Sequence, residues 1–174
     1  MKNNYTNQSL ILYADASAPQ HLAAAGVGCV LTCQLQNFTL ATLSKRIALP
    51  KSCTLHAELQ AIRAGLCLLP RNSEILLRSD SIAALWLLHE TETIAYQDVT
   101  ELCRMTGGKQ KRLELRKKQQ TERFHGVIED CKAELATRSL KISSLWIKGH
   151  SKNEAHALAD RLAASALKER LHAA

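Results

Sequence analysis

Aromatic residues are scarce in this chain of 174 residues, where Phe, Tyr and Trp together make up only 4%. Hydrophobic residues nevertheless reach 46%, so alanine, leucine and other aliphatic side chains must build the core. Because alanine and leucine have high helix propensity, this composition favours a fold with several helices. The length suits one domain of ordinary size, and we expect residues 1–174 to form a single domain.

The six cysteines lack the spacing of a metal-binding or redox motif, since the chain contains no Cys-x-x-Cys pair. The N-terminus is polar and does not resemble a signal peptide. No apolar run approaches the length of a membrane span. We therefore expect a cytoplasmic protein with reduced, mostly buried thiols and no membrane partner. No obligate protein partner is evident, and we expect a monomer.

Acidic residues are nearly absent from residues 104–123, where only Glu114 and Glu122 oppose eight basic residues. The local charge is 8 − 2 = +6, out of a formal net charge of +7 for the whole chain. A one-signed segment of this kind is typical of an arm that binds a polyanion, although a solvated helix face is the alternative. The basic residues are Arg104, Lys109, Lys111, Arg112, Arg116, Lys117, Lys118 and Arg123.

Five segments have the apolar or alternating pattern of β-strands. They span residues 10–14, 24–35, 38–47, 75–77 and 142–147. The first three are joined by short links and should be antiparallel, whereas the last two are separated by helices and should run parallel to the first. The pattern predicts an α/β fold with a mixed five-stranded sheet flanked by helices.

Four segments have helical periodicity: residues 55–69, 82–89, 124–135 and 154–171. Ser52 or Thr54 could cap the first of these helices. The apolar stripe of this helix consists of Leu55, Leu59, Ile62, Leu66 and Leu69. The expected apolar face of the last helix consists of Ala155, Leu158, Leu162 and Ala166.

Four acids stand where predicted core elements meet loops, and a histidine follows the last strand. They are Asp15, Glu58, Asp80 and Asp160, with His150. The ends of strands are where an α/β protein presents its chemistry. Four converging carboxylates would repel one another unless cations lay between them. The pattern therefore predicts two divalent metal ions and phosphodiester chemistry.

Each of these residues also has a simpler interpretation when it is taken alone. Glu58 lies off the leucine stripe in the first turns of a helix, where the helix dipole favours a negative charge. Asp80 could cap a helix, and Asp160 could be a surface acid. We expect His56 and His156 to lie on the surface or to pack locally, without a catalytic role.

Five motifs together resemble those of type 1 ribonuclease H, and they occur in the same order. They are Tyr13–Ser17, His56–Ile62, Arg78–Ser81, Trp146–Ser151 and Ala159–Ala163. The resemblance covers nearly the whole chain, and it places the basic residues 104–123 in an insertion. It implies a ribonuclease H-like fold and an endonuclease that cuts the RNA strand of RNA–DNA hybrids.

The resemblance also implies a role for each acid around two Mg²⁺ ions, with Mn²⁺ as a possible replacement. Asp15 would bridge both ions, and Asp160 would serve the ion that activates water. Glu58 and Asp80 would hold the ion that stabilises the leaving oxygen. His150 would assist proton transfer or product release. An RNA–DNA hybrid duplex is the implied partner.

The chain departs from the family pattern near the expected substrate. Ala16 replaces a glycine, Leu55 replaces a polar residue, and the usual Asn-Glu pair before the last aspartate appears as His156-Ala157. These differences leave open a non-catalytic or weakly active hybrid-binding module, or another nuclease on the same fold. The expected nucleic-acid contacts are Lys51, Thr54, Lys111, Arg112, Arg116, Lys117 and Lys118.

Overall fold

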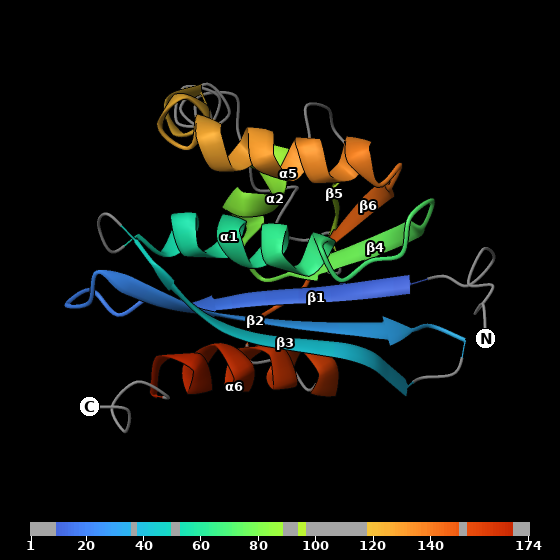
Figure 1. Cartoon of the computed structure of the whole chain (residues 1–174), viewed down its shortest axis with the longest axis horizontal. Coiled ribbons are helices and arrows are strands. Elements are labelled where there is room, and N and C mark those ends of the chain that lie inside the picture. Colours follow the sequence, from blue (N-terminus) through green and yellow to red (C-terminus); the bar gives the residue numbers. More distant parts are fainter. Residues whose placement is uncertain are drawn as a thin grey trace.

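A mixed β-sheet runs through the middle of the molecule (Figure 1). The computed structural model describes residues 10–35, 38–49, 53–88, 94–96, 118–149 and 153–168. The strands are β1 (Leu10–Ser17), β2 (Ala24–Cys33), β3 (Phe38–Ala48), β4 (Glu74–Ser79), β5 (Ile94–Tyr96) and β6 (Lys141–Trp146). Their order across the sheet is β3-β2-β1-β4-β6-β5.

The direction of the strands confirms the expected fold class. β1, β2 and β3 are antiparallel neighbours, while β4 pairs parallel with β1 and β6 pairs parallel with β4. All five predicted strands are present. The short β5 adds a further parallel strand beside β6 at the sheet edge, and its three residues have too little apolar pattern to be found in the sequence.

Helices cover both faces of the sheet (Figure 1). They are α1 (Thr54–Leu66), α2 (Ile82–Leu88), α5 (His125–Thr137) and α6 (Glu154–Lys168). α1 packs on β1 and β2 and is itself covered by α5, whereas α6 lies on the opposite face against β1, β2 and β3. β1 is therefore buried on both sides: Leu12 joins the core under α1, and Ile11 and Tyr13 join the cluster under α6. No helix among the described residues is long and apolar enough to cross a membrane.

The face that α6 turns toward the sheet is only partly the expected one. Ala166 is buried as predicted, whereas Ala155, Leu158 and Leu162 pack against the cluster under α6 but stay partly exposed. The buried residues of α6 are His156, Ala159, Ala163 and Ala166. The prediction followed the largest apolar side chains and was wrong about the centre of the face, because the helix approaches the sheet through its smallest residues.

Two glycines of β2 explain this close approach. A Cβ atom on Gly28 would overlap the carbonyl oxygen of Ala159 and lie 2.6 Å from the backbone nitrogen of Ala163. A Cβ atom on Gly26 would overlap the carbonyl oxygen of Ala163. The backbone of α6 therefore rests directly on β2, and any side chain at either glycine must push the helix away from the sheet.

We predict that Gly28→Ala destabilises the protein by roughly 1 to 3 kcal/mol, since overpacking of a tight contact forces backbone shifts of about that cost. Urea denaturation measures this change. Gly126→Ala is the matched control, because nothing lies within 4 Å of the added methyl group in α5. The control should be neutral or stabilising by up to about 1 kcal/mol. Equal stability of the two variants would contradict the close approach of α6.

Candidate active site

Asp15 and Asp80 meet because β1 and β4 are parallel neighbours. In this pair Tyr13 lies opposite Arg78, so the residues that follow this pair lie at the same end of the sheet, toward the C-terminal ends of β1 and β4. Glu58 of α1 joins them from the helix that covers this face. The three side chains each offer one ligand atom, and these atoms lie within 4.8 Å of one another. The structure thus brings together three of the four predicted carboxylates.

Glu58 is buried, with only 5% of its surface exposed. The sequence placed it off the apolar stripe of α1, but the helix also buries Ala57 and Ala61, and Glu58 lies between them. Its Oε2 atom is buried and has no hydrogen-bond partner among the described residues. A buried carboxylate oxygen without a donor is costly, and a divalent cation beside Asp15 and Asp80 would compensate it.

Burial and the neighbouring carboxylates raise the pKa values of Asp15 and Glu58. Burial, followed by the charge of Asp80, raises the pKa of Asp15 from 3.8 to about 6. His156 and the backbone N–H of Ala16 partly oppose this shift. Burial, with the charges of Asp15 and Asp80, raises the pKa of Glu58 well above its usual value. The close approach of these acids is thus unfavourable to their charged forms, as expected for a site that awaits cations.

The residues that cap α2 and fix the backbone at Asp80 do not engage its carboxylate. Ser81 caps α2, because its hydroxyl accepts the backbone N–H of Ala84 at 3.4 Å. The indole N–H of Trp146 donates to the carbonyl oxygen of Asp80 at 2.9 Å and fixes the backbone. Gly149 gives room for the carboxylate, since a Cβ atom there would lie 2.5 Å from Asp80 Oδ2. The alternative interpretation of Asp80 as a helix cap is therefore wrong.

Asp160 acts electrostatically on the site but is not one of the three acids whose ligand atoms converge. It lies on α6, on the other face of the sheet. Its charge nevertheless raises the pKa values of both Asp15 and His156. His150 lies outside the described residues, so its predicted role stays a prediction.

His156 is buried beside Asp80, and its expected lack of a catalytic role stays a prediction. It was expected on the surface or in local packing, yet it is 3% exposed and its Nε2 atom lies 3.8 Å from Asp80 Oδ2. The available signal was its position four residues before Asp160, which places both on one side of a helix. The expectation for His56 is consistent with the structure, because its ring packs against Phe124 with centroids 5.6 Å apart.

The predicted nucleic-acid contacts fall mostly outside the described residues. Thr54 is exposed at the first position of α1, and Lys118 is exposed at the start of a helical stretch over 118–123. The cap of α1 is Cys53, which forms no side-chain capping bond, so Thr54 does not cap this helix. The remaining expected contacts outside the described residues are Lys51, Lys111, Arg112, Arg116 and Lys117.

A cavity of about 350 Å³ lies between the start of α1 and the end of the basic segment. Cys53, His56 and Gln60 line it from α1 and its cap, and Arg123 and Phe124 line it from the other side. The Arg123 guanidinium lies 5.1 Å from the centre of the Phe124 ring. One of the eight basic residues thus lies beside the helix that carries Glu58.

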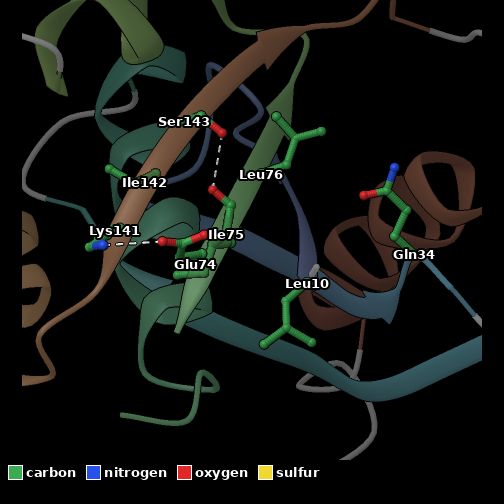
Figure 2. A pocket seen from close by; sticks show the side chains of 8 residues that line it. All are labelled: Leu10, Gln34, Glu74, Ile75, Leu76, Lys141, Ile142 and Ser143. Atoms are coloured by element: carbon green, nitrogen blue, oxygen red, sulfur yellow. Dashed lines mark hydrogen bonds and ion pairs between the residues drawn. The ribbon is translucent and has the colours of Figure 1, made fainter. Parts of the chain in front are cut away.

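A second cavity, of about 390 Å³, opens at the opposite end of the strands (Figure 2). It lies where the parallel strands begin, near Leu10, Glu74 and Lys141. Lys141 Nζ pairs with Glu74 Oε1 at 3.1 Å, and both side chains are exposed. None of the predicted site residues lines this cavity, and it lies away from the strand ends where α/β proteins present their chemistry.

A match to a known family accompanies this geometry: the model of the RNase H family matches residues 7–168. This chain belongs to the RNase H family. Its fold resembles the N-terminal RNase H domain of a Mycobacterium tuberculosis protein, with a TM-score of 0.57 and 17% identity over 91% of this chain and 98% of that one. Among curated proteins, no sequence matches the chain.

Two further RNase H structures have the same fold. The RNase H1 of the halophilic archaeon Halobacterium salinarum has a TM-score of 0.55 and 18% identity, covering 92% of this chain and 98% of its own. LC11-RNase H1, solved in complex with an RNA/DNA hybrid, has a TM-score of 0.58 and 17% identity, covering 91% and 99% respectively. At these identities the likeness shows the fold alone.

The raised pKa values predict that the metal-free protein loses stability as the pH rises. The folded protein binds more protons than the unfolded chain between pH 3.8 and about 6 at Asp15, so its unfolding free energy falls across this window. The change from Asp15 alone is on the order of 2 to 3 kcal/mol, at about 1.4 kcal/mol per pKa unit. Glu58 has a raised pKa and acts in the same direction.

Asp15→Asn isolates this effect, because the amide does not titrate. In EDTA, the variant should become progressively more stable than the wild type between pH 4 and pH 7, as measured by urea denaturation at each pH. Carboxyl groups away from the site titrate equally in both proteins and cancel in the difference. Removal of the Asp15 charge also relieves Glu58, which changes the difference in the same direction. A difference that stays constant with pH would show that Asp15 is not strained by its neighbours.

Proposed function

We propose that this RNase H protein is a metal-dependent endonuclease that hydrolyses the RNA strand of RNA–DNA hybrids. The observation that carries the proposal is the convergence of Asp15, Glu58 and Asp80 within 4.8 Å at the strand ends of an RNase H fold. The buried, unpartnered oxygen of Glu58 supports a cation at this place. A neighbour of the same fold has been solved with an RNA/DNA hybrid, which supports the substrate class.

The four acids would hold two Mg²⁺ ions, or Mn²⁺ in their place. Such ions make water more acidic and stabilise negative charge on the leaving oxygen of a phosphodiester. Asp15 is central because it lies beside both Asp80 and Glu58 and feels the charge of Asp160. The burial of Asp15 and Glu58 keeps bulk water from their inner oxygens, which strengthens electrostatic interactions in the site.

The remaining roles follow the family resemblance. His150 would transfer a proton close to the acids. It follows Gly149 in the chain, and Gly149 lies against the carboxylate of Asp80. Thr54, Lys51 and the basic segment 104–123 would contact the hybrid backbone. A ribose 2′-hydroxyl is what distinguishes the RNA strand from the DNA strand. The expected single domain, cytoplasmic location and monomeric state stay predictions.

A weakly active hybrid-binding module is the second candidate. It is favoured by the start of α1, where Cys53 makes no side-chain capping bond and Leu55 packs against the core instead of offering a polar group. The loss of such contacts would weaken the grip on the hybrid without removing the carboxylates. Another nuclease on the same fold would differ in its substrate, so one assay separates all three possibilities.

We expect Mg²⁺-dependent cleavage of the RNA strand in a labelled hybrid, and little cleavage of double-stranded RNA or duplex DNA. Asp15→Asn and Asp80→Asn should each abolish cleavage, because each removes a charge from the metal cluster. Both variants should remain folded by circular dichroism. Gel analysis with Mg²⁺, Mn²⁺ or EDTA measures the outcome. Tight hybrid binding without cleavage would favour the binding module, and preferential cleavage of duplex DNA would favour another nuclease.

Replacing Lys111, Arg112, Arg116, Lys117 and Lys118 with glutamine should raise KM and flatten the salt dependence of hybrid binding. Each phosphate contact contributes roughly −0.9 to the log–log salt slope on duplex DNA, and a hybrid should behave comparably. The value of kcat should change little, because the arm binds ground and transition states alike.

Lys132 and Lys141 provide the control for this arm. Both are described residues outside the segment, and each forms an ion pair, with Glu129 and Glu74 respectively. The double glutamine variant should keep the wild-type salt slope, as measured by fluorescence anisotropy with a labelled hybrid. If the arm and control variants lost affinity equally, the basic segment would be a solvated surface.

A further inference from the structure

His156 is fixed in place by the start of α6. The side-chain oxygen of Asn153 accepts the backbone N–H of His156 at 3.0 Å and so caps the helix. The amide nitrogen of Asn153 donates to the hydroxyl of Tyr13 in β1 at 3.3 Å. Because Tyr13 lies two residues before Asp15, β1 positions both the acid and the start of the helix that carries His156. The start of α6, and with it His156, is therefore fixed relative to Asp15.

The imidazole lies beside Asp80, outside the group of three acids whose ligand atoms converge. Nε2 lies 3.8 Å from Asp80 Oδ2, and the charges of Asp15 and Asp160 also act on the ring. Burial alone would lower the pKa of His156, but the neighbouring carboxylates of Asp80, Asp15 and Asp160 raise it. Nδ1 is buried and has no hydrogen-bond partner among the described residues.

A purely packing role explains this arrangement poorly. The separation of 3.8 Å between Nε2 and Asp80 Oδ2 is too long for a good hydrogen bond. Two donor atoms that share one ion at about 2.1 Å each lie roughly 3 to 4 Å apart, which is the separation between Nε2 and Asp80 Oδ2. The pair is thus spaced as two ligands of one cation.

We propose that His156 is a nitrogen ligand to a divalent ion held beside Asp80. The inference rests on the proposed metal-dependent function and adds one residue to its ligand set. Carboxylates alone suit Mg²⁺, whereas an imidazole nitrogen is a softer donor that favours transition metals. The site therefore binds Mn²⁺ more tightly, relative to Mg²⁺, than a site of carboxylates only.

Pulsed electron paramagnetic resonance of the Mn²⁺-loaded protein, without substrate, tests this directly. A histidine nitrogen bound to Mn²⁺ gives a ¹⁴N coupling, which changes to a ¹⁵N pattern when the protein is labelled with ¹⁵N-histidine. We expect this coupling in the wild type. We expect it also in His150→Ala, the control for the histidine that follows Gly149 in the chain. It should be absent in His156→Asn.

Metal affinities give a second readout. His156→Asn should weaken Mn²⁺ binding by about tenfold or more in calorimetry, and Mg²⁺ binding much less. Should this variant fail to fold, the labelled wild type and His150→Ala still decide whether a nitrogen binds.

Three results would overturn the assignment. Mn²⁺ bound without any nitrogen coupling would remove His156 from the ligand set and leave the carboxylate centre standing. A coupling that persists in His156→Asn would assign the nitrogen to another residue. The absence of any Mn²⁺ or Mg²⁺ binding would overturn the proposed metal-dependent function as well.

Discussion

The repulsion among buried carboxylates is the constraint on which the rest of this structure depends. Asp15, Glu58 and Asp80 offer ligand atoms within 4.8 Å of one another, although Asp15 and Glu58 are almost inaccessible to water. Separating them would relieve the repulsion, so the framework must resist that movement. The ladder between β1 and β4 holds the two aspartates, and the apolar core holds α1 against β1. The stability of the fold is thus partly used to keep the acids together.

Much of this arrangement could be predicted from sequence, because strand ends can be recognised locally. An apolar run that stops at an acid identified Asp15 and Asp80, and the parallel order of their strands implied that they meet. The orientation of the helices could not be found in this way. α1 buries Glu58 and α6 buries His156, and both facts depend on which side of each helix faces the sheet.

The error in α6 has a specific physical cause. Leu158 and Leu162 dominate its hydrophobic pattern, and an isolated helix would present them to a core. Gly26 and Gly28 instead let the backbone of α6 at Ala159 and Ala163 approach β2 closely, so the helix turns these alanines toward the sheet. Such complementarity joins residues more than a hundred positions apart, and no local window of the sequence contains it. The rotation that satisfies the glycines is also the one that buries His156.

The packing of α6 and the chemistry of the site are therefore one problem. His156 and Ala159 lie on one face of the helix, so contact of Ala159 with Gly28 directs the imidazole toward Asp80. Asp160, the residue after Ala159, remains partly exposed, and its charge raises the pKa of Asp15. A glycine pair with no chemistry of its own thus sets which α6 residues reach the acids. The ligand set of this centre is determined by backbone proximity as much as by the acids themselves.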